Sequence, residues 1–437
     1  MKIGIRREDK NQWEARVPLI PEHVKDLTEY ADLKFVVQPS PIRAFSEEEY
    51  EQAGAQISED LSDCPVVVAV KEIPIDFFIP EHAYVFFSHT IKGQEYNMPM
   101  LKQLMANKNT LIDYERILDD QGRRLVFFGR FAGIAGMIDT LWALGKRLEW
   151  EGHSSPFSIC KQALGYVNLD AVKRHYSQLA STILEEKVDF DDKPVVFGFA
   201  GYGNVSRGAQ EMFDLLPHVD IYPEGLQELF ASQHYDKNVI YKVVFKEEHL
   251  VRPRSPEKEF ELAEYYEHPE RYASRFEEYL PYLTVLVNAI YWDERYPRLV
   301  TKEYLKKAYT ESGQQQLRVI GDVTCDTEGS IECNVESTDS GNPVYVYDPL
   351  SGTHTYGVAG NGPVVLAVDN LPCELPRESS AVFSDVLKGL MIPLSKADFR
   401  VPFEQLDLPP ELKRAVILRR GELTPDYRYM QEYVENL

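Results

Sequence analysis

The 437-residue chain lacks the features that mark several classes of protein. Its five cysteines are odd in number and irregular in spacing, so we expect reduced thiols, and no Cys/His cluster has the spacing of a zinc site. No apolar run reaches the ~18 residues that a membrane-spanning helix needs, and the opening MKIGIRREDK has no apolar signal segment. We therefore expect no metal, no membrane association and a cytoplasmic location.

Positive charge is also scarce. Lys and Arg total 47 against 70 for Asp and Glu, which gives a formal net charge of -23. Such a chain is repelled by nucleic acid and by anionic membrane surfaces, so neither is an expected partner. The expected partners are small molecules, and a homo-oligomer is one possible assembly that the sequence does not decide.

Apolar runs alternate with helical patterns along most of the chain. Continuous apolar strands separated by helices are typical of a parallel sheet with both faces covered. The first third suggests strands at 1–5, 33–37, 65–70, 84–88 and 110–114, with helices at 21–30, 47–53 and 94–106. Later strands are expected at 194–201, 219–222, 284–290, 318–322 and 364–368, with helices at 132–151, 169–186, 207–216 and 380–390.

This order predicts two Rossmann-like α/β domains, each a doubly wound parallel sheet, with a cleft between them. Residues 1–131 with 372–437 would form a substrate and catalytic domain, since charged helical turns at the tail are expected to pack on the first domain. Residues 132–371 would form a dinucleotide-binding domain. The stretch 257–279, rich in Glu, Tyr and Arg, is expected to be a solvated helical excursion.

A glycine-containing turn follows the strand expected at 194–201. Gly201 and Gly203 would let the backbone turn tightly, and the following residues Asn204 and Val205 open a helix. The amino end of such a helix presents free N–H groups to a pyrophosphate, so this segment predicts a dinucleotide site. The third glycine of the usual motif is replaced by Ser206.

The type of nucleotide depends on the end of the next strand. An acidic residue there usually binds the ribose hydroxyl of NAD. The strand at 219–222 ends at Tyr222, with Glu224 two residues beyond. We place Tyr222 in the cofactor site and leave NAD(H) and NADP(H) open, with a slight preference for NADP(H).

Ionisable residues follow several strands of the first third. The carboxyl ends of parallel strands share one edge of a sheet, where ligands bind, so these side chains should converge. The cations among them suit a small ligand that carries carboxylates. The set comprises Lys71, Glu72, His89, Lys92, Asp113 and Glu115, with Arg6, Arg7, Lys10 and Arg16 after the first strand and Arg123 and Arg124 after the last.

Several stretches together resemble the lysine-ketoglutarate reductases, also called saccharopine dehydrogenases (lysine-forming). The pattern is more distantly similar to alanine dehydrogenase. The stretches are 5–9 (IRRED), 13–19 (WEARVPL), 86–92 (FFSHTIK), 129–136 (GRFAGIAG), 201–210 (GYGNVSRGAQ), 290–292 (IYW), 321–331 (GDVTCDTEGSI) and 369–376 (DNLPCELP).

The resemblance implies that the ε-amine of lysine condenses with 2-oxoglutarate and that NADPH or NADH reduces the imine to saccharopine, reversibly. It implies acid–base roles for Lys71 and His89, groups that can titrate near neutrality. The substrate-binding positions that it implies are Arg16, Glu72, Lys92, Glu115 and Arg124. Asp322 and Asp326 would flank the nicotinamide.

Two other functions fit the same residues. One is an amino-acid dehydrogenase of the alanine type, which uses ammonia. The other is a non-catalytic nucleotide-sensing protein. The sequence also departs from the bifunctional members of the resembled family, because we expect no second, glutamate-releasing half. Either another protein would process saccharopine, or the product is a different one.

Overall fold

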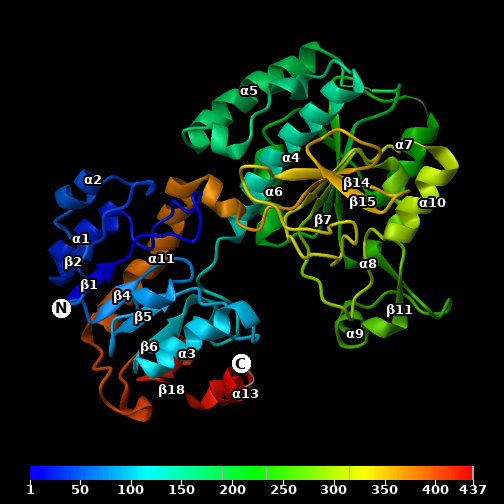
Figure 1. Ribbon diagram of the computed structural model, residues 1–437. Helices are drawn as coiled ribbons and strands as arrows, with labels where there is room; N and C mark the ends of the chain where they lie inside the picture. The colour runs from blue at the N-terminus through cyan, green and yellow to red at the C-terminus, as the bar shows by residue number, and fades with distance from the viewer. Residues whose placement is uncertain (189, 233, 314, 436–437) are drawn as a thin grey trace. The chain divides into compact units, whose positions relative to one another are not determined.

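The computed structural model describes residues 1–188, 190–232, 234–313 and 315–435. The chain divides into two compact units (Figure 1). The first comprises Met1–Phe128 together with the residues from Pro376 onward, and the second is the continuous segment Gly129–Leu375. The predicted α/β class is confirmed, because each unit is built on a largely parallel sheet with helices.

The sheet of the first unit is parallel except at one edge. Its order is β18 (Glu422–Leu423), β17 (Val416–Arg419), β6 (Thr110–Asp113), β5 (Ala83–Phe86), β4 (Val66–Val68), β1 (Lys2–Ile5), β2 (Lys34–Val37) and β3 (Gln56–Ile57). From β6 to β3 all neighbours are parallel, whereas β17 pairs antiparallel with β6 and β18. Side chains of β4 and β5 are buried throughout, as expected for strands covered on both faces.

Helices surround this sheet, and local signals fix their ends. They are α1 (Pro21–Ala31), α2 (Glu47–Gln52), α3 (Met98–Ala106), α11 (Pro376–Lys396), α12 (Pro410–Arg414) and α13 (Gln431–Glu435). Helix α2 begins with a capping box between Ser46 and Glu49. Helices α1 and α11 pack together, and the Ser384 hydroxyl of α11 accepts from the backbone N–H of Ile20 at 2.9 Å.

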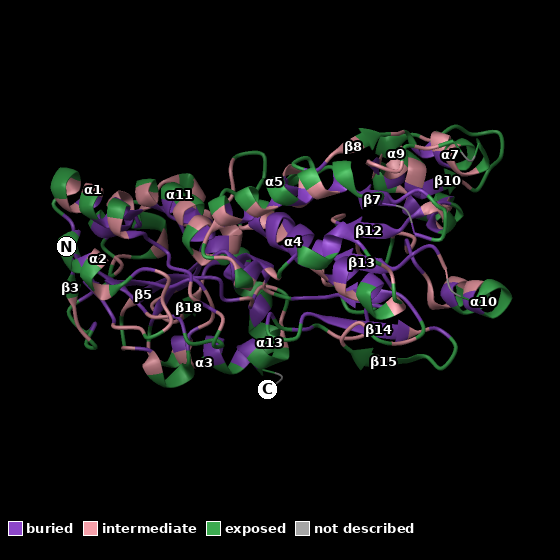
Figure 2. Cartoon of the chain, turned by 90° about the horizontal axis from the view of Figure 1, so that it is seen from above, coloured by how far each residue is buried: buried purple, intermediate pink, exposed green. Residues whose placement is uncertain are grey.

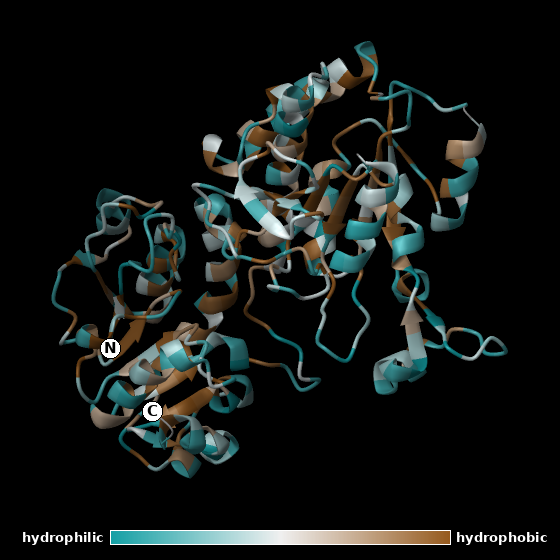
Figure 3. Ribbon diagram, turned by 45° about the vertical axis from the view of Figure 1, so that its right-hand side comes forward, coloured by the Kyte–Doolittle hydropathy of each residue, from teal (hydrophilic) through white to brown (hydrophobic). Residues whose placement is uncertain are grey.

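The second unit has a sheet of the same kind. Its order is β15 (Thr353–Tyr356), β14 (Val344–Asp348), β16 (Val364–Leu366), β13 (Val319–Asp322), β12 (Val285–Asn288), β7 (Val196–Ala200), β9 (Ile240–Phe245) and β8 (His218–Asp220). Only the pairs that involve β14 are antiparallel among these strands. Figure 2 shows β7, β12 and β13 as buried, and Figure 3 shows the strands as apolar with more polar helices around them.

The helices of this unit are α4 (Gly129–Glu151), α5 (Leu169–Glu185), α6 (Asn204–Phe213), α7 (Leu226–Ser232), α8 (Glu247–Leu250), α9 (Leu262–Glu267) and α10 (Lys302–Ser312). A short antiparallel pair, β10 (Val251–Pro253) and β11 (Tyr272–Ser274), lies outside the main sheet. Helix α4 crosses α6 closely: a Cβ on Gly133 would meet the Val205 carbonyl oxygen at 1.9 Å, and one on Gly208 would meet that of Arg130 at 2.0 Å. Only glycine allows this approach.

The structure corrects three expectations. Residues 257–279 are not a solvated helix, because Tyr265, Tyr272 and Phe276 are buried in a core cluster and only a short helix forms there. The tail forms short helical segments as expected, among them α12 and α13, but it also contributes the unexpected strands β17 and β18. Strand β9 was not predicted, and it lies between β7 and β8.

Among the described residues, each helix is too short or too polar to span a bilayer. Over the same ranges no group of three or more His, Cys, Asp or Glu side chains is arranged to hold a metal ion.

Candidate active site

Glu72 is the centre of a charged cluster at the carboxyl ends of β4 and β5. Its Oε1 lies 2.7 Å from His89 Nδ1 and 2.9 Å from Lys10 Nζ. Lys71, the preceding residue, adds positive charge to the same surroundings. The carboxyl ends of β4 and β5 therefore bring an amine, an imidazole and a carboxylate together, as expected for neighbouring parallel strands.

The electrostatics of the cluster fix the state of the Glu72–His89 pair. Burial raises the pKa of Glu72, but the hydrogen bond and charge of His89, with Lys10 and Lys71, hold that pKa well below its ordinary value of 4.5. An ionised carboxylate only accepts hydrogen bonds, so Nδ1 of His89 carries the hydrogen. The other ring nitrogen, Nε2, is then an acceptor when the ring is neutral.

The backbone of His89 has an unusual conformation. Its φ is 47°, in the left-handed region that costs a non-glycine residue about 1–2 kcal/mol. Asn97 donates to the carbonyl of His89 at 3.2 Å, and Phe87 stacks on the imidazole with ring centroids 6.1 Å apart. These contacts hold the ring against Glu72.

Two other ion pairs of the first unit involve predicted substrate-binding residues. Arg124 Nη2 contacts Glu115 Oε1, and the Arg124 side chain is half exposed. Arg16 donates from Nε and Nη2 to the two oxygens of Glu14, at 2.7 and 2.6 Å, and its guanidinium lies 4.2 Å from the centroid of the Phe128 ring. Arg16 is thus buried in a bidentate pair, and Arg124 faces solvent.

The remaining predicted substrate-binding position of this unit is Lys92, which is exposed in the turn after β5. The structure therefore brings Lys71, Glu72 and His89 together. It places Glu115 with Arg124 as a second group. Sequence reasoning noted Lys10 among the edge cations but did not single it out as the second partner of Glu72.

In the second unit, the predicted glycine turn joins β7 to α6. Gly201 has a φ of 95°, which favours glycine. Gly203 precedes the first turn of α6 without any side-chain cap, and a Cβ there would meet nothing within 4 Å. Backbone N–H groups at the start of α6 therefore have no side-chain cap, which fits the binding of a pyrophosphate there. Asn204 is exposed and Val205 is half-buried.

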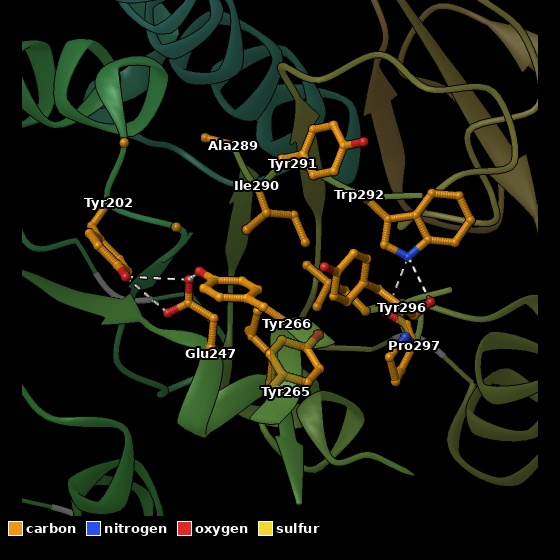
Figure 4. Close-up of a pocket in the computed structure, with 14 residues that line it drawn as sticks. Tyr202, Glu247, Tyr265, Tyr266, Ala289, Ile290, Tyr291, Trp292, Tyr296 and Pro297 are labelled. Carbon is orange, nitrogen blue, oxygen red and sulfur yellow. Dashed lines mark hydrogen bonds between the residues drawn. The ribbon is translucent and has the colours of Figure 1, made fainter. Parts of the chain in front are cut away.

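A pocket of about 280 Å³ adjoins this turn (Figure 4). Several aromatic side chains and one carboxylate, that of Glu247, line the pocket. Figure 4 shows Glu247 between two tyrosines. Tyr266 donates to Glu247 at 2.7 Å and Tyr202 donates to it at 3.1 Å. The lining residues are Gly201, Tyr202, Gly203, Glu247, Leu250, Tyr265, Tyr266, Ala289, Ile290, Tyr291, Trp292, Tyr296, Pro297 and Leu299.

Five predicted cofactor residues lie outside the lining of this pocket: Asn204 and Val205 at the start of α6, and three residues on other segments. Tyr222 is 84% exposed. Asp326 is exposed in the loop after β13. Asp322 is buried, and its carboxylate accepts from Asn288 and Asn334 at 2.8 Å each, so it holds the neighbouring loop together.

The strand that follows α6 in the sequence is β8, but it is not the neighbour of β7 in the sheet. Strand β8 ends at Asp220, at the sheet edge, whereas the neighbour of β7 is β9. Lys246 and Glu247 directly follow β9. The apolar run 239–245 (VIYKVVF) was the signal that could have located them, but Lys242 interrupts it.

Comparisons with known proteins first define the class. Residues 4–135 match the family model described as alanine dehydrogenase/PNT, N-terminal domain. A solved L-alanine dehydrogenase superposes with a TM-score of 0.62 at 20% identity, covering 100% of this chain and 99% of that one. At this identity the likeness concerns the fold alone, which is that of the two-domain Rossmann-like dehydrogenases.

Relatives found by sequence indicate a more specific group of enzymes. The chain is 38% identical over 98% of its length to "Alpha-aminoadipic semialdehyde synthase" of Arabidopsis thaliana, of which it covers 41%. It is 36% identical over 99% of its length to the mitochondrial synthase of Bos taurus, of which it covers 48%. It thus spans about half or less of these relatives. Against "Saccharopine dehydrogenase [NAD(+), L-lysine-forming]" of Emericella nidulans, identity is 25%, with 90% of this chain and 92% of that one covered. The family resemblance inferred from the motifs is confirmed.

Proposed function

We propose that the protein is an NAD(P)-dependent saccharopine dehydrogenase of the L-lysine-forming type. The observation that carries the proposal is the Lys71–Glu72–His89 cluster at the carboxyl ends of β4 and β5. It lies in a chain that is related over nearly its whole length to proteins of that name. In the reaction, the ε-amine of lysine and the ketone of 2-oxoglutarate form a C–N bond, and the ketone oxygen leaves as water.

The residues of the cluster suit the proton transfers of this condensation. The lysine substrate must lose a proton before it attacks, and the departing hydroxyl must gain one. Nε2 of His89 can accept and return a proton because Glu72 holds the hydrogen on Nδ1. We assign the second acid–base role to Lys71. A bound dinucleotide supplies the hydride that reduces the imine, and the proposed cofactor-binding set is Gly201, Gly203, Asn204, Val205, Tyr222, Asp322 and Asp326.

Cations of the first unit are proposed to bind the substrate carboxylates. Arg124 and Lys92 are accessible to solvent, and Arg124 already pairs with the carboxylate of Glu115, which a substrate could exchange for its own. Arg16, held by Glu14 and Phe128, is the third proposed cation. Several cations suit a product with three carboxylates.

For the nucleotide we propose a preference for NADP(H). Lys246 is exposed directly after β9, the strand next to β7, where a cation can bind a 2′-phosphate. Glu247 is already bound by two tyrosine hydroxyls. Lys246→Gln should therefore lower kcat/KM for NADPH about 10-fold, the effect of losing one charge-assisted contact, and leave that for NADH unchanged. Equal losses with both nucleotides would reject the preference.

A turnover assay on the purified protein tests the reaction. NADPH or NADH oxidation is expected only when lysine and 2-oxoglutarate are both present, with saccharopine detected by mass spectrometry. Failure to oxidise either nucleotide with every pair of amino acid and 2-oxo acid would reject the proposal.

An alternative is an amino-acid dehydrogenase of the alanine type, which the match of residues 4–135 and the shared fold favour. It would oxidise NADH with pyruvate and ammonium and need no second amino acid. The same assay therefore separates the two reactions.

Location and assembly are also proposals. We place the protein in the cytoplasm and expect small molecules as its partners, with a homo-oligomer as one possible assembly. Light scattering of the purified protein gives its mass in solution, and fractionation of the source cells gives its compartment.

A further inference from the structure

The two proposed catalytic residues follow the inner strands of a four-strand set. In the sheet order β6-β5-β4-β1, strand β4 leads to Lys71 and β5 leads to His89. The flanking strands lead to two buried carboxylates. Glu8 follows β1 and is 5% exposed, and Asp113 ends β6 and is fully buried.

Glu8 binds the backbone that carries Lys71. Its Oε1 accepts from the N–H of Val70 at 2.7 Å, and its Oε2 accepts from the N–H of Lys71 at 2.9 Å. Both donors lie just beyond the end of β4 at Val68. The carboxylate therefore supplies acceptors where the regular pairing of β1 with β4 has ended.

Asp113 does the same for the backbone that carries His89. Its Oδ2 accepts from the N–H of Ser88 at 3.0 Å and from the Ser88 hydroxyl, just beyond the end of β5. Its Oδ1 accepts from the N–H of Glu115 at 2.7 Å. One side chain thus ties the segment of His89 to that of Glu115.

We propose that Glu8 and Asp113 are positioning residues that fix the backbone of Lys71 and His89 so that their side chains meet at Glu72. The proposal rests on the proposed function, because it gives Lys71 and His89 catalytic roles. The carboxyl groups of Glu8 and Asp113 lie at the ends of strands that neighbour β4 and β5 in one sheet, so their hydrogen bonds tie the two segments to a regular frame. His89 needs such support, since its left-handed backbone would otherwise relax.

Glu8 also makes this arrangement sensitive to pH. Burial, with the nearby charge of Glu14, raises the pKa of Glu8 to about 7, although its two backbone hydrogen bonds and Arg6 oppose the shift. Arg43 and Tyr114 are its other charged or titratable neighbours. Protonation would turn one acceptor oxygen into a donor, so the hold on Lys71 weakens as pH falls through about 7.

Three variants and a matched control test the proposal in the full chain. Glu8→Gln and Asp113→Asn each replace a carboxylate by an amide of the same size, and Ser88→Ala removes only a hydroxyl. The control is Asp60→Asn, because Asp60 also accepts from a backbone N–H, that of Ser62 at 2.8 Å, but is exposed. Glu8→Gln and Asp113→Asn should lower kcat ~10–100-fold, the usual effect of a displaced catalytic group, with nucleotide affinity unchanged.

Ser88→Ala should lower kcat about 3- to 10-fold, as expected for one lost hydrogen bond. If the other two variants do not fold, this variant decides the test. Glu8→Gln should also remove the acid limb near pH 7 from the pH profile of kcat. A variant that had only lost stability would keep the acid limb of its kcat profile near pH 7. Unchanged kcat and pH profiles in the folded variants would overturn the proposal.

Hydrogen–deuterium exchange separates this proposal from the proposed reaction. Amides of residues 70–71 should exchange faster in Glu8→Gln, and that of Ser88 faster in Asp113→Asn and Ser88→Ala, with no change in Asp60→Asn. This result does not depend on any substrate, so a protein that lacks the proposed turnover still gives it. Unchanged exchange at these amides would overturn the inference by itself.

Discussion

At the scale of single residues, the proposed chemistry depends on an amine beside an ionised carboxylate. Lys71→Met removes the amine and keeps the length of the side chain. We expect kcat to fall by roughly 10²–10⁴-fold, the span for losing an acid–base group. Binding of the nucleotide, measured by fluorescence titration, should be unchanged because the glycine turn belongs to the other unit.

Lys102→Met is the matched control, since Lys102 is exposed on α3 in the same unit. It should keep the rate of the unaltered protein. If Lys71→Met also keeps that rate, Lys71 has no part in the mechanism. A protein that binds nucleotide but is unaffected by both Lys71→Met and His89→Gln would fit the nucleotide-sensing alternative.

A second prediction concerns two carboxyl groups buried in the second unit. Asp139 of α4 and Glu374, in the segment just before α11, are each other's main charged neighbour, and burial holds the pKa of both above the ordinary values of 3.8 and 4.5. The folded state therefore binds protons more tightly than the unfolded state. This stabilisation is complete below about pH 4 and is lost as pH rises through about 6, the pKa of Asp139.

Glu374→Gln should flatten this dependence and raise the free energy of unfolding by roughly 1–3 kcal/mol at pH 8, because one buried charge is removed. Urea denaturation at pH 5, 6, 7 and 8 measures it. Parallel curves for the variant and the unaltered protein would show that the pair does not titrate in this range.

At the scale of elements, the crossing of α4 and α6 positions the glycine turn. Gly133 and Gly208 let the two helices approach closely, and Arg130 adds a bidentate pair with Glu211 at 2.7 and 2.8 Å. Gly208→Ala puts a methyl group into the Arg130 carbonyl, so α6 must move. We expect a loss of ~1–3 kcal/mol in stability and a weaker nucleotide affinity.

Gly389→Ala is the control for this variant, because Gly389 lies within α11 and a Cβ there meets nothing within 4 Å. It should be neutral or stabilising by up to ~1 kcal/mol. Thermal unfolding and nucleotide titration of both variants measure the effects. An unchanged affinity in Gly208→Ala would mean that the crossing stabilises the unit without positioning the turn.

Elements with simple patterns could be predicted from the sequence. The buried strands β4, β5 and β7 are continuous apolar runs, and the glycine turn has its own motif. Strand β9 was missed because Lys242 interrupts it, and the structure shows why a lysine is tolerated there: its ammonium pairs with Asp214 at 2.5 Å. Strand β15 (THTY) is mostly exposed and lacks an apolar face.

The candidate site could be predicted only in part. The strand ends that carry Lys71 and His89 follow from parallel pairing, and the structure does place both near Glu72. The order of strands is a long-range property that no local pattern contains, so the position of β9 beside β7 was not foreseen. Burial of Asp322 among Asn288 and Asn334 likewise depends on three distant segments.

At the scale of the whole molecule, the second unit is one continuous segment with its own core. Residues 129–375, expressed alone, should fold and bind the nucleotide, because the cores that involve β7, β9 and β12 lie within this segment. They should show no turnover, since Lys71 and His89 are absent. Circular dichroism and fluorescence titration measure this. An unfolded or aggregated segment would mean that the unit requires the rest of the chain.

The first unit is assembled from both ends of the chain, and this has a consequence for biosynthesis. Strand β17 pairs with β6, yet the ribosome must translate the whole second unit between them. At 5–20 residues per second, roughly 250 residues take about 12–50 s. During that time the edge of β6 and the surface later covered by α11 are exposed on the nascent chain, so chaperones that shield apolar segments should bind it in that interval and leave when the tail emerges.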